Sequence, residues 1–119
     1  MILMQKTITQ DGNDIGDIRL LTYPNMYKIP YIQYEVDAEY RNQGIMSREL
    51  PIFLKSCKKH SYHQICAMVQ DDNLPSIKLL TKNNFVEYTK IRNITTYLTD
   101  LRLDTQTLKK LLNTYTQQK

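Results

Sequence analysis

The chain has 119 residues, of which 41% are hydrophobic and 24% are charged, so it suits one compact domain and leaves no room for a second. Its formal net charge of +4 is compatible with a polyanionic cofactor, with nucleic acid, or with a lysine-rich surface, and therefore does not choose among them. Two cysteines, Cys57 and Cys66, make neither a zinc signature nor a disulfide framework, and no apolar run approaches the length of a membrane span. We therefore expect a cytoplasmic protein with buried, reduced cysteines, no metal site and no membrane contact.

Residues 1–21 are predicted to form an antiparallel β-hairpin. Apolar and β-branched residues run as far as Thr9, turn formers cluster from Asp11-Gly12, and strand character resumes at Ile15. The segment from Tyr23 to Pro30 contains two prolines and is predicted to be a connection.

A strand, a polar loop and a helix are predicted next, with the strand and loop over residues 31–46 and the helix over 47–59. Tyr31 to Val36 alternates with a period of two residues, as a half-buried strand does. Pro51 falls within the helical pattern and would either kink the helix or mark a start close to Ser47. The apolar positions at helical spacing are Met46, Leu50, Phe53, Leu54 and Cys57.

A buried strand and a second helix are predicted to follow. Residues 63–69 are apolar on both faces, which is typical of a central strand covered on both sides. Asn73 is a favourable N-cap for a helix over residues 73–84, with Leu74 among its apolar face. Asn83-Asn84 can supply the left-handed residue that ends this helix.

The remaining pattern predicts an α+β fold with a mostly antiparallel, twisted sheet and flanking helices. Strand, helix and strand from Tyr31 to Val69 make a right-handed crossover between two parallel strands the default. Residues 85–101 alternate loosely and should add one or two antiparallel strands. Residues 104–116, capped by Asp104 or Thr105, are predicted to form a last helix.

The loop that follows Val36 is a candidate anion site. Backbone N–H groups from about Gln43 to Ser47, at the start of a helix, suit a pyrophosphate, and Gly44 lets a ligand approach the backbone closely. Arg41 and Arg48 would add charge-assisted hydrogen bonds. Because many strand-to-helix loops contain one glycine, the loop alone is better explained by a structural role.

A second segment, Asn73-Leu74-Pro75-Ser76, follows the loop after one strand–helix–strand crossover, and the two segments together are a more specific signal than either alone. Together with the loop it resembles the GCN5-related N-acetyltransferase superfamily, whose acyl-CoA signature is Gln/Arg-x-x-Gly-x-Gly/Ala. The segment that corresponds to this signature is Arg41-Asn42-Gln43-Gly44-Ile45-Met46. Its last residue, Met46, departs from the signature, but similar Gly-x-Met variants occur in the branch that acetylates ribosomal-protein N-termini. A second family motif, Asn-x-x-Ser followed by a helix and Gly-Phe, matches through Asn84-Phe85, with asparagine in place of the glycine. The resemblance covers residues 1 to 98.

This resemblance implies the acyl-CoA N-acyltransferase fold and transfer of an acetyl group from acetyl-CoA directly to a primary amine. The parallel strands ending at Val36 and near Val69 would splay around the pantetheine arm, which backbone groups near Val36 and the side chain of Asn73 would hold. The loop would hold the pyrophosphate. The implied cofactor-binding residues are Val36, Arg41, Asn42, Gln43, Gly44, Ile45, Met46 and Asn73.

The catalytic residues are less clearly indicated. Many family members use a helix tyrosine as the acid, but that position holds Leu80 here. Resemblance to the ribosomal-protein branch makes Ser76 the candidate acid, and Glu35, on the strand, is the candidate base. Alternation puts Glu35 and Tyr34 on opposite faces, so only one can point into the cleft, and a water chain could replace the base. Ser76 could equally be a helix residue that faces solvent, and an exposed carboxylate on a strand such as Glu35 is more often only a solvated residue.

The N-terminal part of the chain does not identify the amine acceptor. The family usually opens with a strand and one or two helices that build the acceptor pocket, whereas only a hairpin precedes Tyr31. The site could be open to a small-molecule or peptide amine, completed by a homodimer, or no longer catalytic. A non-catalytic acyl-CoA-binding module is therefore the alternative function. A small basic nucleic-acid-binding domain ranks last, because no aromatic stripe or basic cluster supports it.

Overall fold

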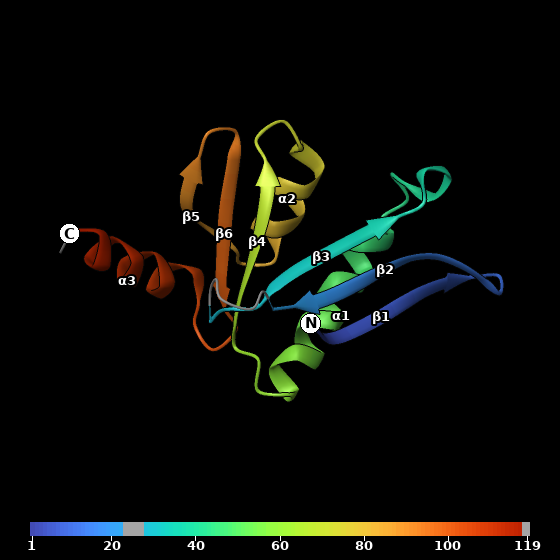
Figure 1. Ribbon diagram of the computed structural model, residues 1–119, viewed down its shortest axis with the longest axis horizontal. Helices are drawn as coiled ribbons and strands as arrows, with labels where there is room; N and C mark the ends of the chain where they lie inside the picture. Colours follow the sequence, from blue (N-terminus) through green and yellow to red (C-terminus); the bar gives the residue numbers. More distant parts are fainter. Residues whose placement is uncertain (23–27, 118–119) are drawn as a thin grey trace. The chain divides into compact units, whose positions relative to one another are not determined.

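The structure, a computed structural model, describes residues 1–22 and 28–117, so most of the predicted connection from Tyr23 to Pro30 lies outside the described residues. The chain divides into two units, Met1–Tyr62 and His63–Lys119 (Figure 1). That the two act as a single domain stays a prediction. No helix in the described ranges is long and apolar enough to span a membrane.

The first unit is a three-stranded antiparallel sheet with one long helix. Strand β2 pairs with β1 on one side and with β3 on the other. The short 3₁₀ helix Ala38–Tyr40 separates β3 from the long helix. The main elements are β1 (Ile2–Gln10), β2 (Asn13–Leu21), β3 (Tyr31–Val36) and α1 (Ile45–Lys59).

The predicted hairpin is confirmed, and its turn has the expected chemistry. Asp11 and Gly12 connect β1 to β2 with φ angles of 52° and 82°. Two successive residues with positive φ are the signature of the type I′ turn, whose twist matches that of the strands it joins. Gly16 has a different role, because a Cβ atom there would collide with the Glu35 carbonyl oxygen on β3. Only glycine allows β2 and β3 to approach this closely.

Helix α1 covers one face of this sheet. The ammonium group of Lys6 on β1 lies 2.7 Å from a carboxylate oxygen of Glu49 on α1. Lys6 pairs in register with Ile18, and Ile18 with Tyr34, so these three residues share the face that α1 covers. The fully or nearly fully buried residues of α1 are Ile45, Leu50, Phe53, Leu54 and Cys57.

Four of those five residues were predicted, but the start of the helix was not. The helix begins at Ile45, two residues before Ser47, and Pro51 lies inside it. Ile45 rather than Met46 faces the core, and Met46 is half-buried.

The second unit is also a three-stranded antiparallel sheet, in which β6 lies between β4 and β5. Figure 1 shows these strands side by side, with α3 beyond β5. Residues 85–101, for which one or two strands were predicted, form two strands. The elements are β4 (Gln64–Gln70), α2 (Leu74–Lys82), β5 (Val86–Ile91), β6 (Ile94–Asp100) and α3 (Thr105–Gln117).

Two apolar residues of this unit depart from prediction. Met68 is 48% exposed, so β4 is not covered on both sides along its whole length. Leu74 is 61% exposed and does not belong to the apolar face of α2. It occupies the first position of the helix, where the side chain projects beyond the core that Leu79 and Leu80 help to form.

The end of α2 confirms the predicted asparagine terminator. Asn84 adopts a left-handed conformation with a φ of 65°. Phe85 N–H donates to the Leu80 carbonyl at 3.0 Å and Asn84 N–H to the Thr81 carbonyl at 3.2 Å, which is the Schellman arrangement. Leu80 and Phe85 are both buried, and they supply the hydrophobic pair that accompanies this motif. Asparagine thus does here what glycine does at most helix ends.

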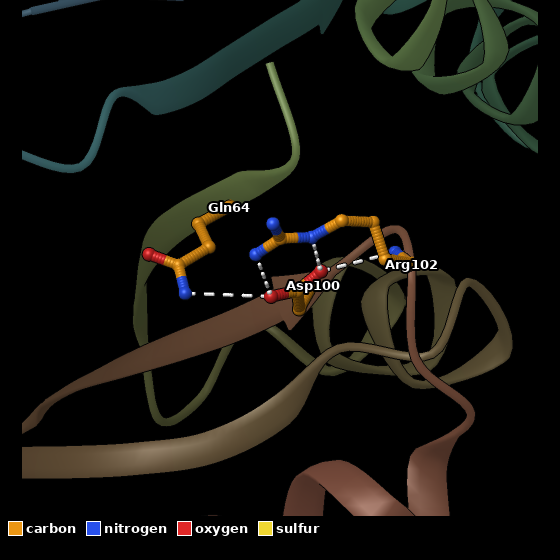
Figure 2. A network of polar contacts seen from close by, with 3 residues as sticks. All are labelled: Gln64, Asp100 and Arg102. Atoms are coloured by element: carbon orange, nitrogen blue, oxygen red, sulfur yellow. Dashed lines mark hydrogen bonds and ion pairs between the residues drawn. The ribbon is translucent and has the colours of Figure 1, made fainter. Parts of the chain in front are cut away.

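A buried carboxylate ties the end of β6 to β4 (Figure 2). Asp100, 4% exposed, accepts hydrogen bonds from Arg102 Nε and Nη2 at 3.0 and 2.8 Å and from Gln64 Nε2 at 3.3 Å. The Arg102 guanidinium and backbone N–H, helped by Gln64, lower the pKa of Asp100 to about 2, although burial opposes them. Nothing in the sequence pattern had indicated this network.

Candidate functional site

The loop between β3 and α1 has an unusual backbone. Asn42 and Gly44 both have positive φ, 63° and 73°, and Gly44 is the N-cap residue of α1. Left-handed residues that alternate with right-handed ones can align successive peptide N–H groups into an anion-binding concavity. The loop residues from Arg41 to Gly44 are all exposed.

The first turn of α1 presents donors without acceptors. Among the described residues, no side chain or carbonyl accepts a hydrogen bond from the backbone N–H groups of residues 43–47, and the first such bond is that of Arg48 N–H to the Gly44 carbonyl at 3.2 Å. The first turn contains no acidic residue. Because these groups lie at the positive end of the helix dipole, the arrangement favours an anion.

Two side chains hold the loop from within. Arg41 Nε donates to the Val36 carbonyl at 3.1 Å, and Gln43 Nε2 donates to the Glu39 carbonyl at 3.3 Å. Backbone groups near Val36 were expected to hold the pantetheine arm, and in the structure Arg41 uses one of the two lone pairs of the Val36 carbonyl. The two terminal nitrogens of the Arg41 guanidinium have no acceptor in the described part of the chain. These two hydrogen bonds therefore hold the loop in place, while the terminal nitrogens of the exposed Arg41 guanidinium can still bind a ligand.

Glu35 lies on the sheet face that α1 leaves uncovered. It is exposed, and it stands directly opposite Asp17 on β2. Asp17 in turn lies 3.2 Å from Arg19 Nε in an ion pair that lacks hydrogen-bond geometry. As alternation predicts, Tyr34 occupies the other face, so Glu35 is the acidic group that this strand offers to solvent.

Asn73 and Ser76 lie together at the start of α2 in the second unit. Asn73 Oδ1 accepts a hydrogen bond from Ser76 N–H at 3.3 Å, which is the geometry of an N-cap. The exposed Asn73 keeps its side-chain nitrogen without an acceptor among residues 1–22 and 28–117. Ser76 is half-buried, and Leu80, at the position of the absent tyrosine, is fully buried.

The structure thus groups the candidate residues in two sets. The first unit brings together Val36, the loop from Arg41 to Met46, and the neighbouring Glu35 on β3, while the second unit brings together Asn73 and Ser76. Sequence reasoning missed Asp71, whose carboxylate contacts Lys90 and Thr95 beside the second set. The only sequence signal for it is the acidic pair that precedes Asn73.

The sequence of residues 4–85 matches the family model for the acetyltransferase (GNAT) family. The chain belongs to the GNAT family. The match includes both segments described above, the loop that begins at Arg41 and the turn that carries Asn73 and Ser76. No curated protein matches the chain by sequence.

Several solved structures share the fold at low sequence identity. An N-acetyltransferase from Staphylococcus aureus Mu50 is 24% identical with a TM-score of 0.69, over 80% of this chain and 66% of that one. A ribosomal-protein-alanine N-acetyltransferase from Brucella melitensis is 15% identical with a TM-score of 0.71, over 80% and 67%. Mycobacterium smegmatis RimJ, in complex with CoA-disulfide, is 22% identical with a TM-score of 0.65, over 81% and 52%.

These likenesses confirm the predicted fold class, an α+β fold of the acyl-CoA N-acyltransferase kind. The chain covers between about half and two thirds of the length of these three solved proteins. The likeness therefore concerns the fold alone.

Proposed function

We propose that this GNAT-family chain is an acetyl-CoA-dependent N-acetyltransferase that moves the acetyl group directly to a primary amine. The observation that carries the proposal is the row of N–H groups from Gln43 to Ser47 that have no acceptor among the described residues. The row lies within a stretch that resembles the family's acyl-CoA signature except at Met46, inside the range that the family model matches. A pyrophosphate is a dianion with several acceptor oxygens, and it suits such a row at a helix N-terminus.

Each loop residue has a proposed part in binding. Gly44, with no side chain, leaves room for the phosphate oxygens against the backbone, and the residues on either side, Gln43, Ile45 and Met46, contribute their N–H groups. Asn42 sets the direction of the loop through its left-handed conformation. Arg41 adds charge through the guanidinium nitrogens that the Val36 carbonyl does not use.

The second lone pair of the Val36 carbonyl and the side-chain nitrogen of Asn73 are proposed to bind the amide groups of pantetheine. Both are polar groups that can form one more hydrogen bond than the structure shows, in keeping with the flexible, amide-containing arm of coenzyme A.

The transfer itself needs a neutral amine and an acid for the departing thiolate. Glu35, exposed on the uncovered face of its sheet, is proposed to accept a proton from the amine, directly or through water. The neutral amine then attacks the thioester carbonyl, the carbon–sulfur bond breaks as the amide forms, and the nitrogen loses its second proton to water. Ser76 is proposed to protonate the sulfur, because Leu80 has no group to donate, and to regain its proton from water.

One observation favours a second function, acyl-CoA binding without catalysis. Leu80 is fully buried where many relatives have the acidic tyrosine, so catalysis depends on Ser76 alone for its acid. Turnover by the wild type separates the two functions, and loss of turnover in a Ser76→Ala variant with unchanged acetyl-CoA affinity supports Ser76 as the acid. Unchanged turnover would show that Ser76 is not the acid.

The direct test combines binding and turnover. Acetyl-CoA at millimolar concentration is expected to raise the melting temperature, and thiol release across a panel of small amines and N-terminal peptides is expected to identify an acceptor. No stabilisation would contradict both acetyl transfer and acyl-CoA binding. Stabilisation without thiol release on any amine would favour the binding module.

Two further features stay predictions. A homodimer could complete the acceptor site, and light scattering at several concentrations would detect it. The cytoplasm is the predicted compartment, in which the two buried, free cysteines Cys57 and Cys66 would stay reduced.

A further inference from the structure

The turn between β4 and α2 carries both site residues of the second unit. Asp71 and Asp72 follow β4 directly, and Asn73 and Ser76 begin α2. Within the turn, Asn73 N–H donates to the Gln70 carbonyl at 3.0 Å. The direction in which α2 starts is therefore decided in these few residues.

A side chain fastens this turn to the neighbouring hairpin. Asp71 Oδ1 accepts a hydrogen bond from the Thr95 hydroxyl on β6 at 2.8 Å, and Asp71 Oδ2 lies 2.8 Å from Lys90 Nζ on β5. The Asp71 backbone N–H also donates to the Asn93 carbonyl, in the tip of the hairpin, at 2.8 Å. Three interactions from one residue thus join the turn to the hairpin.

These interactions differ in strength. Thr95 is 3% exposed, whereas the Lys90 side chain is 54% exposed, and an exposed ion pair stabilises a protein little. The Thr95 hydroxyl is therefore the stronger side-chain anchor. Lys90 is nevertheless the larger of the two causes that lower the pKa of Asp71, and the hydrogen bond from Thr95 is the second. Glu87 and Tyr97 are the other ionisable groups that act on Lys90.

We propose that Asp71 is a positioning residue that fixes the start of α2, and with it Asn73 and Ser76, for acetyl transfer. The inference rests on the proposed function of those two residues. Groups that act on a reacting bond must keep their geometry to about half an ångström, which requires support from their neighbours. A carboxylate bound on both oxygens, two residues before Asn73, gives that support.

The chain offers a matched control in the adjacent residue. Asp72 is exposed, and its carboxylate has no partner in the described part of the chain, although it has the same charge and belongs to the same turn. Comparing Asp71→Ala with Asp72→Ala therefore separates anchoring from the mere loss of a negative charge. Asp71→Asn retains an oxygen for the Thr95 hydroxyl, and Thr95→Val removes only the hydroxyl.

The experiment compares two ligands. Acetyl-CoA engages both the loop and the pantetheine-binding residues, whereas its pantetheine-free nucleotide half, adenosine 3′-phosphate 5′-diphosphate, engages only the loop in the first unit. Affinity for each ligand is measured by calorimetry, and kcat/KM by thiol release with the best amine of the panel. Circular dichroism establishes that each variant is folded.

Asp71→Ala is expected to lower kcat/KM by roughly 10- to 100-fold while affinity for the nucleotide half stays unchanged. Thr95→Val should show part of this loss, Asp71→Asn should recover most of the activity, and Asp72→Ala should resemble the wild type. Wild-type kcat/KM in Asp71→Ala, or a parallel loss of affinity for both ligands, would overturn the inference. Should Asp71→Ala not fold, Thr95→Val decides by the same readouts.

The proposed function fails in a different way. A wild-type chain that binds neither acetyl-CoA nor its nucleotide half contradicts the proposed function, and the positioning role falls with it. A wild-type chain that binds and turns over acetyl-CoA while Asp71→Ala does so equally well contradicts only the positioning role.

Discussion

Replacing Gly44 by alanine should separate the binding role of the loop from its structural role. Gly44 has a φ of 73°, and a Cβ atom built there meets nothing within 4 Å, so alanine is opposed by backbone strain alone. A left-handed alanine costs about 1–2 kcal/mol, which sets the expected loss in the free energy of unfolding. In the complex the methyl group would occupy space that phosphate oxygens need, and we expect affinity for coenzyme A to fall at least about tenfold, or about 1.4 kcal/mol.

The hairpin turn supplies the control for this substitution. Gly12 has a φ of 82° and also has nothing within 4 Å of a built Cβ atom, so Gly12→Ala carries a similar strain far along the sequence from the loop. Urea denaturation should show comparable destabilisation of both variants, and calorimetry with coenzyme A should show a loss of affinity only for Gly44→Ala. Wild-type affinity in Gly44→Ala, or an equal loss in Gly12→Ala, would refute the reasoning.

Three further predictions concern stability. Gly16→Ala should destabilise the fold by about 3 kcal/mol or more in urea, because its Cβ would collide with the Glu35 carbonyl, and near-wild-type stability would contradict that contact. Arg102 lowers the pKa of Asp100 from 3.8 to about 2. The ionised Asp100 should therefore contribute roughly 1–2 kcal/mol to the free energy of unfolding above about pH 4, and this contribution should be lost as the pH falls toward 2. The stability difference between wild type and Asp100→Asn should shrink over that range, and a constant difference would exclude the ion pair as its source. Asn84→Gly should stay within about 0.5 kcal/mol of wild type in thermal unfolding, whereas Asn84→Ala should lose about 1–2 kcal/mol, and equal stabilities would argue against the left-handed conformation.

The sequence predicted the elements well where their chemistry is local. Asp11-Gly12 specifies its own turn, and Asn84 ends α2 with the left-handed conformation that asparagine tolerates. The start of α1 was misplaced because Gly44, which caps the helix with its backbone alone, gives no side-chain signal. The exposure of Met68 was missed because an apolar run does not reveal whether both faces of a strand are covered.

The candidate site was predicted as a set of residues but not as a set of contacts. The resemblance to the GCN5-related N-acetyltransferase superfamily pointed to the loop and to Asn73, since the motifs of that superfamily consist of residues adjacent in sequence. The brace between Arg41 and the Val36 carbonyl was not predictable, because it depends on the path of the backbone. The same is true of Asp71, whose partners Thr95 and Lys90 are distant in sequence and meet it only through strand register.

The central claim is that this chain binds acetyl-CoA through the loop at Gly44 and transfers its acetyl group to an amine. The most direct measurement incubates the wild-type protein and Gly44→Ala with acetyl-CoA and the amine panel, and quantifies free thiol and acetylated amine together by mass spectrometry. We expect equal amounts of thiol and acetylated product with the wild type, and a strongly reduced yield with Gly44→Ala at limiting acetyl-CoA. Thiol release without an acetylated amine, or equal yields from both proteins, would contradict it.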